Sequence, residues 1–177
     1  MPKTITMTLS QSSIQNAIKE LKEYEGQLVT KCNVLCGKLA EMGLVVAKAN
    51  ISSAPLGKYV RLNVKYEPMK AGCKAMLIAT GDTLNTPSGS INTLLMIEFG
   101  SGWKFNTVPN PKASELGYGV GTYPNQTHAF DPDGWYYLGE DNKWHHSYGV
   151  KATMPMYNAS TEIMLNINKV AREVFNS

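Results

Sequence analysis

The chain has 177 residues, of which 43% are hydrophobic and 18% charged, and its formal net charge is +3 at pH 7. This length fits one domain with a core of its own, and the composition excludes a disordered chain. The small, scattered positive charge argues against a nucleic-acid-binding protein. No apolar run approaches the roughly 18 residues of a membrane span, and the N-terminus lacks the apolar region of a signal peptide. We therefore expect one domain over residues 1–177.

The N-terminal part predicts a strand followed by a long helix. Apolar and polar residues alternate over residues 3–9, which is typical of a half-buried strand. Ser10 to Ser13 offer N-caps, and apolar residues recur at helical spacing from Ile14 to Val46. We expect this helix to be kinked or broken near Gly26 and to end near Asn50.

The middle of the chain predicts an antiparallel pair of strands and a short helix. Tyr59–Tyr66 and Cys73–Thr80 both alternate and are joined by a short turn. Gly81–Ser90 is polar and is interpreted as a loop. The apolar run Ser90–Phe99 favours a short helix with Gly100 as its C-cap.

Residues of about 100–150 form a long insertion rich in aromatic residues and glycine. The region from residue 97 to 158 holds all three tryptophans, all three histidines and eight of the fifteen glycines. Within it, Gly134–Leu138 and Lys143–Tyr148 predict a hairpin. A C-terminal helix follows, capped by Thr153 with Pro155 in its first turn. Its predicted buried face consists of Met156, Ala159, Ile163, Ile167, Val170 and Val174.

These elements predict an α+β fold, in which the long N-terminal helix and the C-terminal helix pack on a small antiparallel sheet. The three cysteines, Cys32, Cys36 and Cys73, are an odd number, which argues against a secreted disulfide framework and favours folding in a reducing cytoplasm. Cys32 and Cys36 could join His145 and His146 around zinc, but both cysteines lie on or beside the apolar helix face, where free cysteine behaves as a small hydrophobe.

For the other candidate sites, a structural role explains the residues better than a catalytic or binding role. His128 lies near Asp131 and Asp133 and could act as a general base or metal ligand, but histidines in such turn-rich segments more often hold a loop in shape. The glycines from Gly117 to Gly121 resemble a phosphate loop, but Pro124 disfavours the helix that such a loop requires. We therefore expect no catalytic residue, no cofactor and no metal.

Glu98 stands in a mostly apolar stretch. A buried carboxylate there would need a partner, which Arg61 or Arg172 could supply. An exposed position on the short helix is the favoured interpretation.

The aromatic residues of the insertion are too many to pack only on one another, and exposed aromatics at this density favour protein partners. The predicted interaction residues are Trp103, Phe105, Tyr118, Tyr123, His128, Trp135, Tyr136 and Trp144.

Three motifs in this order resemble the minor tail component, or tail-completion and head–tail connector, proteins of long-tailed bacteriophages and prophages. They are a Glu-Phe-Gly-Ser-Gly step at Glu98–Gly102, a Gly-Thr-Tyr-Pro-x-Gln-Thr-His segment at Gly121–His128, and Gly-Trp-Tyr-Tyr and Trp-His-x-x-x-Gly pieces at Gly134–Tyr137 and Trp144–Gly149. The C-terminal helix is entered through Ala-Thr-Met-Pro. The motif residues are Glu98, Phe99, Gly100, Gly102, Gly121, Pro124, Gly134, Gly149 and Pro155. The segment Ala54–Tyr59 departs from the family, because it lacks the Asp-Thr pair of the usual turn.

This resemblance implies a noncatalytic virion protein that forms a sixfold ring at the neck. Its expected partners are further copies of itself, the head connector or head-closure protein, and the tail terminator or tail tube protein, with only passive contact with DNA in the channel. Such a protein assembles in the host cytoplasm. Three alternatives stay open: a tail-terminator ring, a small metal-dependent hydrolase using His128, Asp131, His145 or Cys36, and a carbohydrate-binding module using the tryptophans.

Overall fold

The computed structural model describes residues 4–69, 72–86, 89–102, 104, 108–117, 131–139 and 141–176. The elements in chain order are α1 (Gln11–Ser52), the 3-10 turn η1 (Gly57–Tyr59), β1 (Val60–Pro68), β2 (Cys73–Gly81), β3 (Thr83–Thr86), β4 (Gly89–Asn92), α2 (Thr93–Phe99), β5 (Trp135–Leu138), β6 (Trp144–Ser147) and α3 (Pro155–Asn176). The fold is α+β, as the sequence predicts. None of the described helices has the length and apolar character that crossing a membrane requires.

Helix α1 is continuous over 42 residues, so the predicted kink near Gly26 is wrong. The Ser10 hydroxyl caps the helix by accepting a hydrogen bond from the backbone N–H of Ser13 at 3.3 Å. One glycine costs only about 1 kcal/mol in a helix interior, and the surrounding leucine, lysine and glutamate residues are good helix formers. The helix therefore passes through Gly26 without a break.

Substitution by alanine should have opposite effects on stability at two glycines of α1. A Cβ at Gly26 would meet nothing within 4 Å, so Gly26→Ala should strengthen the helix by up to about 1 kcal/mol. A Cβ at Gly43 would lie 2.7 Å from Cδ1 of Ile163, so Gly43→Ala should displace the end of the Ile163 side chain and lower stability. Amide hydrogen exchange along α1 checks both. Slower exchange around residue 43 in Gly43→Ala would contradict the packing shown here.

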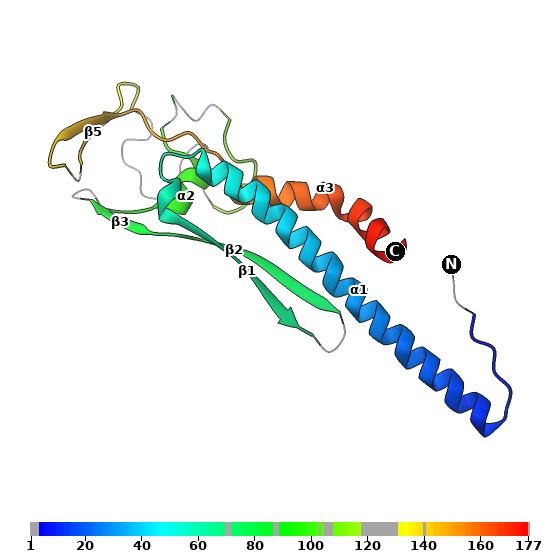
Figure 1. Cartoon of the computed structure of the whole chain (residues 1–177). Helices are drawn as coiled ribbons and strands as arrows, with labels where there is room; N and C mark the ends of the chain where they lie inside the picture. Colours follow the sequence, from blue (N-terminus) through cyan, green and yellow to red (C-terminus); the bar gives the residue numbers. More distant parts are fainter. Residues whose placement is uncertain are drawn as a thin grey trace.

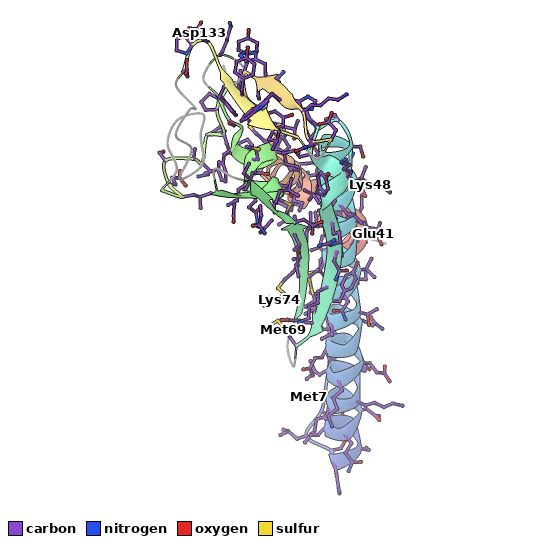
Figure 2. All side chains as sticks on the ribbon, turned by 90° about the vertical axis from the view of Figure 1, so that its left-hand side faces the viewer. Met7, Glu41, Lys48, Met69, Lys74 and Asp133 are labelled. Carbon is purple, nitrogen blue, oxygen red and sulfur yellow. A yellow bond between two sulfur atoms is a disulfide. The ribbon has the colours of Figure 1, made fainter. Side chains whose placement is uncertain are left out.

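The strand predicted for residues 3–9 is also wrong over its described part. Residues 4–8 are extended but pair with no described strand. The segment is anchored by a hydrogen bond from the Thr8 backbone N–H to the Ser13 hydroxyl at 2.9 Å. Met7 lies beside the first turns of α1 (Figure 2). An alternating pattern forms a strand only where a neighbouring edge accepts its hydrogen bonds.

The strands form three separate antiparallel pairs instead of one small sheet. β1 pairs with β2 from Val60↔Gly81 to Pro68↔Cys73, as predicted. β3 and β4 form a hairpin that covers most of the segment predicted to be a polar loop and the first residues of the predicted short helix, which begins only at Thr93. Leu84 faces Ile91 in this hairpin, and such a cross-strand pair is too short a signal to stand out from the polar residues around it. The hairpin of β5 and β6 is confirmed.

The core lies where α1, α2 and α3 meet. α3 runs alongside the C-terminal half of α1, and the β1–β2 hairpin lies on another side of the same half (Figure 1). Leu39 of α1 packs with Val170 and Val174 of α3. At the end of α1, Ile51 packs with the fully buried Ile97 of α2. The N-terminal half of α1 extends beyond both neighbours (Figures 1 and 2).

The predicted buried face of α3 is only partly right. Ala159, Val170 and Val174 are buried, and Ile163 packs against the same cluster. Ile167 is 44% exposed, because it lies at the edge of the contact with α1 and not at its centre.

Cys36 of α1 and Cys73 of β2 form a disulfide, and Cys32 is a free thiol. The interpretation of Cys36 as a free small hydrophobe is therefore wrong. Packing of the β1–β2 hairpin on α1 brings the Cα atoms of the pair to 6.7 Å. Residues 37 positions apart give no sequence signal of that proximity.

Candidate interaction site

Glu98, the first residue of the Glu-Phe-Gly-Ser-Gly motif, is 8% exposed. Its carboxylate accepts hydrogen bonds from the backbone N–H groups of Met156 and Tyr157, at 2.9 and 3.0 Å, and from the Asn110 side-chain amide at 2.9 Å. The first turn of a helix has N–H groups without partners inside the helix, and its dipole favours a negative charge there. Glu98 therefore caps α3 from a distant position in the sequence.

This arrangement corrects three predictions. Glu98 is buried instead of exposed, and its partners are the N-terminus of α3 and Asn110 instead of an arginine. Arg61 pairs with Asp82. Thr153 does not cap α3, since its N–H and its hydroxyl both donate to the carbonyl of Ile97, at 2.8 and 3.4 Å. Pro155 is the first residue of α3, as predicted.

Burial raises the pKa of Glu98 above its ordinary value, although hydrogen bonds from Met156, Tyr157 and Asn110 act in the opposite direction. Removing a carboxylate from water disfavours its charged form, and here that loss exceeds the gain from three donors. No described cation lies in hydrogen-bond contact with this carboxylate. In the described part of the chain, the contacts of this group are those of a structural cap.

The glycines of the motif form a close joint between two backbone segments. Ser101 and Val150 exchange two backbone hydrogen bonds, both at 2.8 Å. Gly102 and Gly149 have φ values of +80° and +115°. A Cβ at Gly102 would lie 2.1 Å from the Tyr148 carbonyl oxygen, and one at Gly149 only 1.9 Å from that of Ser101. Only glycine fits both the backbone conformation and the space.

The same motif ends α2. Gly100 has a φ of +74° and donates its N–H to the Met96 carbonyl at 2.8 Å, so the predicted C-cap is confirmed. Phe99 is buried in the core with Met96 and Ala113. The motif thus ends one helix, caps another and joins the two ends of the insertion.

The β5–β6 hairpin lies next to this joint, because β6 ends at Ser147, two residues before Gly149. Gly134 has a φ of +71°, and a Cβ there would lie 2.3 Å from the Ser147 carbonyl oxygen. Asp141 accepts hydrogen bonds at the turn from the Lys143 backbone and from Nε2 of His145, at 3.2 and 2.9 Å. The hydrogen bond with His145 is the main cause that lowers the pKa of Asp141.

The two histidines of β6 contact different aromatic rings. His145 stacks on Tyr137 at 5.6 Å between centroids, and His146 lies 4.6 Å from Tyr136 and 4.4 Å from Tyr148. Nε2 of His146 also lies 2.7 Å from the Asp133 carbonyl oxygen. The two rings therefore order the hairpin separately and form no shared site.

Large side chains of the hairpin lie exposed at one end of the molecule, where Asp133 is seen in Figure 2. Trp144 is 70% and Tyr136 is 68% exposed, while Trp135 is half-buried. Tyr137 and Leu138 are also exposed. Of the predicted interaction residues, the hairpin brings together Trp135, Tyr136 and Trp144. The others, Trp103, Phe105, Tyr118, Tyr123 and His128, lie outside the described residues, as do the motif residues Gly121 and Pro124.

Among the described residues, no group of three or more histidine, cysteine, aspartate or glutamate side chains could hold a metal ion. Of the residues named for a hydrolase, Cys36 is bonded to Cys73, His145 pairs with Asp141, and Asp131 caps the turn before β5 through the Asp133 N–H at 3.0 Å. His128 lies outside the described part of the chain.

No protein-family model matches the chain, and the comparisons with curated proteins and with solved structures find no match.

Sequence reasoning missed two features of this site. Asn110 is 4% exposed and bonds both the side chain and the carbonyl of Glu98, but an asparagine in a turn-rich segment is most simply interpreted as a turn residue. The exposed N-terminal half of α1 has the same apolar period as its buried half, so the period could not separate the two.

Proposed function

We propose that this chain is a noncatalytic structural protein of a long-tailed phage virion, which assembles into a ring at the head–tail junction. The observation that carries the proposal is the exposed aromatic hairpin, with Tyr136 and Trp144 each about two-thirds exposed on a rigid joint. Tryptophan and tyrosine are enriched among the residues that dominate protein interfaces, and both lose little conformational freedom on binding.

The motif series supports the same proposal from the sequence side. Each described motif residue has a structural task in ending, capping or joining segments, and none of them faces a group with which it could react. Such a motif holds an insertion in a fixed position. A ring requires this, because a feature on one subunit must fit a recess on the next.

A variant of the hairpin tests the proposal. The double variant Tyr136→Ser/Trp144→Ser removes the two most exposed aromatic side chains of the described residues and should convert an oligomeric ring into monomers. Light scattering after gel filtration measures the mass, and electron microscopy shows the ring. Val45→Thr is the matched control, because Val45 is 69% exposed on α1 and the change conserves shape.

The location in the virion is tested separately. We expect the wild-type protein to co-assemble with purified tail or head-connector proteins and to be detected at the neck of the particle. A protein that stays monomeric and never joins either partner would disprove the proposal. If the protein is instead found as the ring that caps the tail tube, it is the tail terminator.

A further inference from the structure

An apolar stripe continues along α1 beyond the helix that covers it. Leu35, Leu39 and Met42 pack against α3. In the N-terminal half of α1, the stripe continues at the same seven-residue spacing. Its members are Ile14, Ile18, Leu21 and Leu28, which are 38%, 48%, 56% and 41% exposed. Positions separated by sevens lie on one side of a helix, so this is one seam, and its first half lies beyond the contact with α3.

The end of α3 explains where the cover stops. The Lys31 ammonium donates to the Phe175 carbonyl at 3.2 Å, and α3 ends one residue later, at Asn176. From Leu28 back to Ile14, α1 continues for about 21 Å at 1.5 Å per residue. The segment of residues 4–10 lies beside this part of α1, and Ala17 is buried, but the large side chains of the seam stay exposed.

A second apolar stripe of similar length lies on the outer side of α3. Met164, Ile167 and Phe175 are 64%, 44% and 38% exposed. With the half-buried Ala171 they follow one another by three or four residues, which places them along one side of the helix, next to the side that packs on α1. Met164 to Phe175 spans about 17 Å, close to the length of the uncovered seam.

The charged residues beside the two stripes indicate which surface of a second copy covers the seam of α1. Glu25 lies on the seam, seven residues after Ile18 and seven before Cys32. A carboxylate inside an apolar contact needs a cation. Arg172, which is exposed, borders the outer stripe of α3. Two parallel α1 seams would instead bring Glu25 against its own copy, and any α1–α1 contact would leave the α3 stripe uncovered.

We infer that the uncovered seam of α1 docks on the outer stripe of α3 of a second copy of this chain, with Glu25 facing the partner's arginine. The two surfaces differ and lie on one molecule, so the contact is head-to-tail and propagates around a ring. The inference rests on the proposed self-assembly and names a contact that the hairpin does not supply.

Site-specific photocrosslinking in the full chain tests this contact. A photoreactive benzoyl-phenylalanine at position 21 should yield a covalent dimer, in which mass spectrometry finds residues 160–176 of the second copy. Position 21 lies about 15 Å beyond Lys31 along α1, too far to reach α3 of its own chain. The same group at position 23, on the opposite side of α1, should yield little dimer.

Charge reversal provides the second measurement. Glu25→Arg and Arg172→Glu should each weaken association at least several-fold, and the double reversal should restore it. Crosslinks into α1 of the second copy, equal dimer from position 23, or no rescue by the double reversal would overturn the inference. A ring without the α1–α3 crosslink overturns the inference and leaves the proposed function standing. If the crosslink forms but the protein is absent from the head–tail junction, the inferred contact stands and the proposed function is overturned.

Discussion

Glu98→Ala should lower the free energy of unfolding by about 3 kcal/mol or more. The substitution leaves the N–H groups of Met156 and Tyr157 without their acceptor, and the amide of Asn110 keeps only the backbone carbonyl of residue 98, at 3.3 Å. Each buried unsatisfied donor costs about 1–3 kcal/mol. Urea denaturation followed by circular dichroism measures the change. Because Glu98 also holds α3 in place, hydrogen exchange in the first turn of α3 should accelerate most.

A matched glutamate separates burial from simple loss of charge. Glu115 is exposed and pairs with Lys112 at 2.7 Å, so Glu115→Ala should change stability far less. Equal losses from the two alanine variants would show that Glu98 is not a cap.

Glu98→Gln keeps the shape of the side chain but replaces its ionisable carboxyl group with an amide that does not titrate. Because burial raises the pKa of Glu98 above its ordinary value of 4.5, the folded protein binds this proton more readily than the unfolded chain. The stability that comes from this difference is fully present below about pH 4.5 and is lost as the pH rises through the folded-state pKa. The advantage of the wild type over Glu98→Gln should therefore shrink as the pH rises above about 4.5. An advantage that grows with pH would mean that the three hydrogen bonds outweigh burial.

Gly149→Ala should have the other large effect, a loss of more than about 3 kcal/mol from backbone strain and displacement together. Its Cβ would lie 1.9 Å from the Ser101 carbonyl oxygen, at a φ of +115°. The clash is with backbone, so the bridge between Ser101 and Val150 must open. Thermal unfolding measures the loss, and the amides of Ser101 and Val150 should lose their protection from hydrogen exchange.

Gly72→Ala is the control for the left-handed conformation alone. Gly72 has a φ of +95°, but a Cβ there would meet nothing within 4 Å. We expect a loss of only about 1–2 kcal/mol, from strain without a clash. If Gly149→Ala costs no more than Gly72→Ala, the joint tolerates a side chain and is not the rigid base of the hairpin.

Local patterns in the sequence were sufficient for most of the regular structure. The period from Ile14 to Val46 predicts α1, alternation predicts β1 and β2, and Gly100 ends α2, because each depends on residues within one or two turns of one another. The hairpin of β5 and β6 was predictable for the same reason. The β3–β4 hairpin was not, since one apolar cross-strand pair is too weak a signal.

The candidate site was predictable only as a region. The sequence indicated that aromatic residues gather near Trp135 and Trp144, but exposure depends on what the rest of the fold covers. The resemblance identified Glu98 as a motif residue and gave no reason for it. That reason, a carboxylate capping a helix 58 residues later, exists only after α2 and α3 have packed.

By itself, the sequence determined where the helices and two of the three hairpins form, because hydrophobic period and turn chemistry act over a few neighbouring residues. Only the tertiary structure decided that Glu98 is buried, that Cys36 meets Cys73, and that α3 covers half of the α1 seam. The physical reason is common to all three. Each depends on which segments pack together in space, and a repeating pattern along one helix is the same whether or not another helix lies against it.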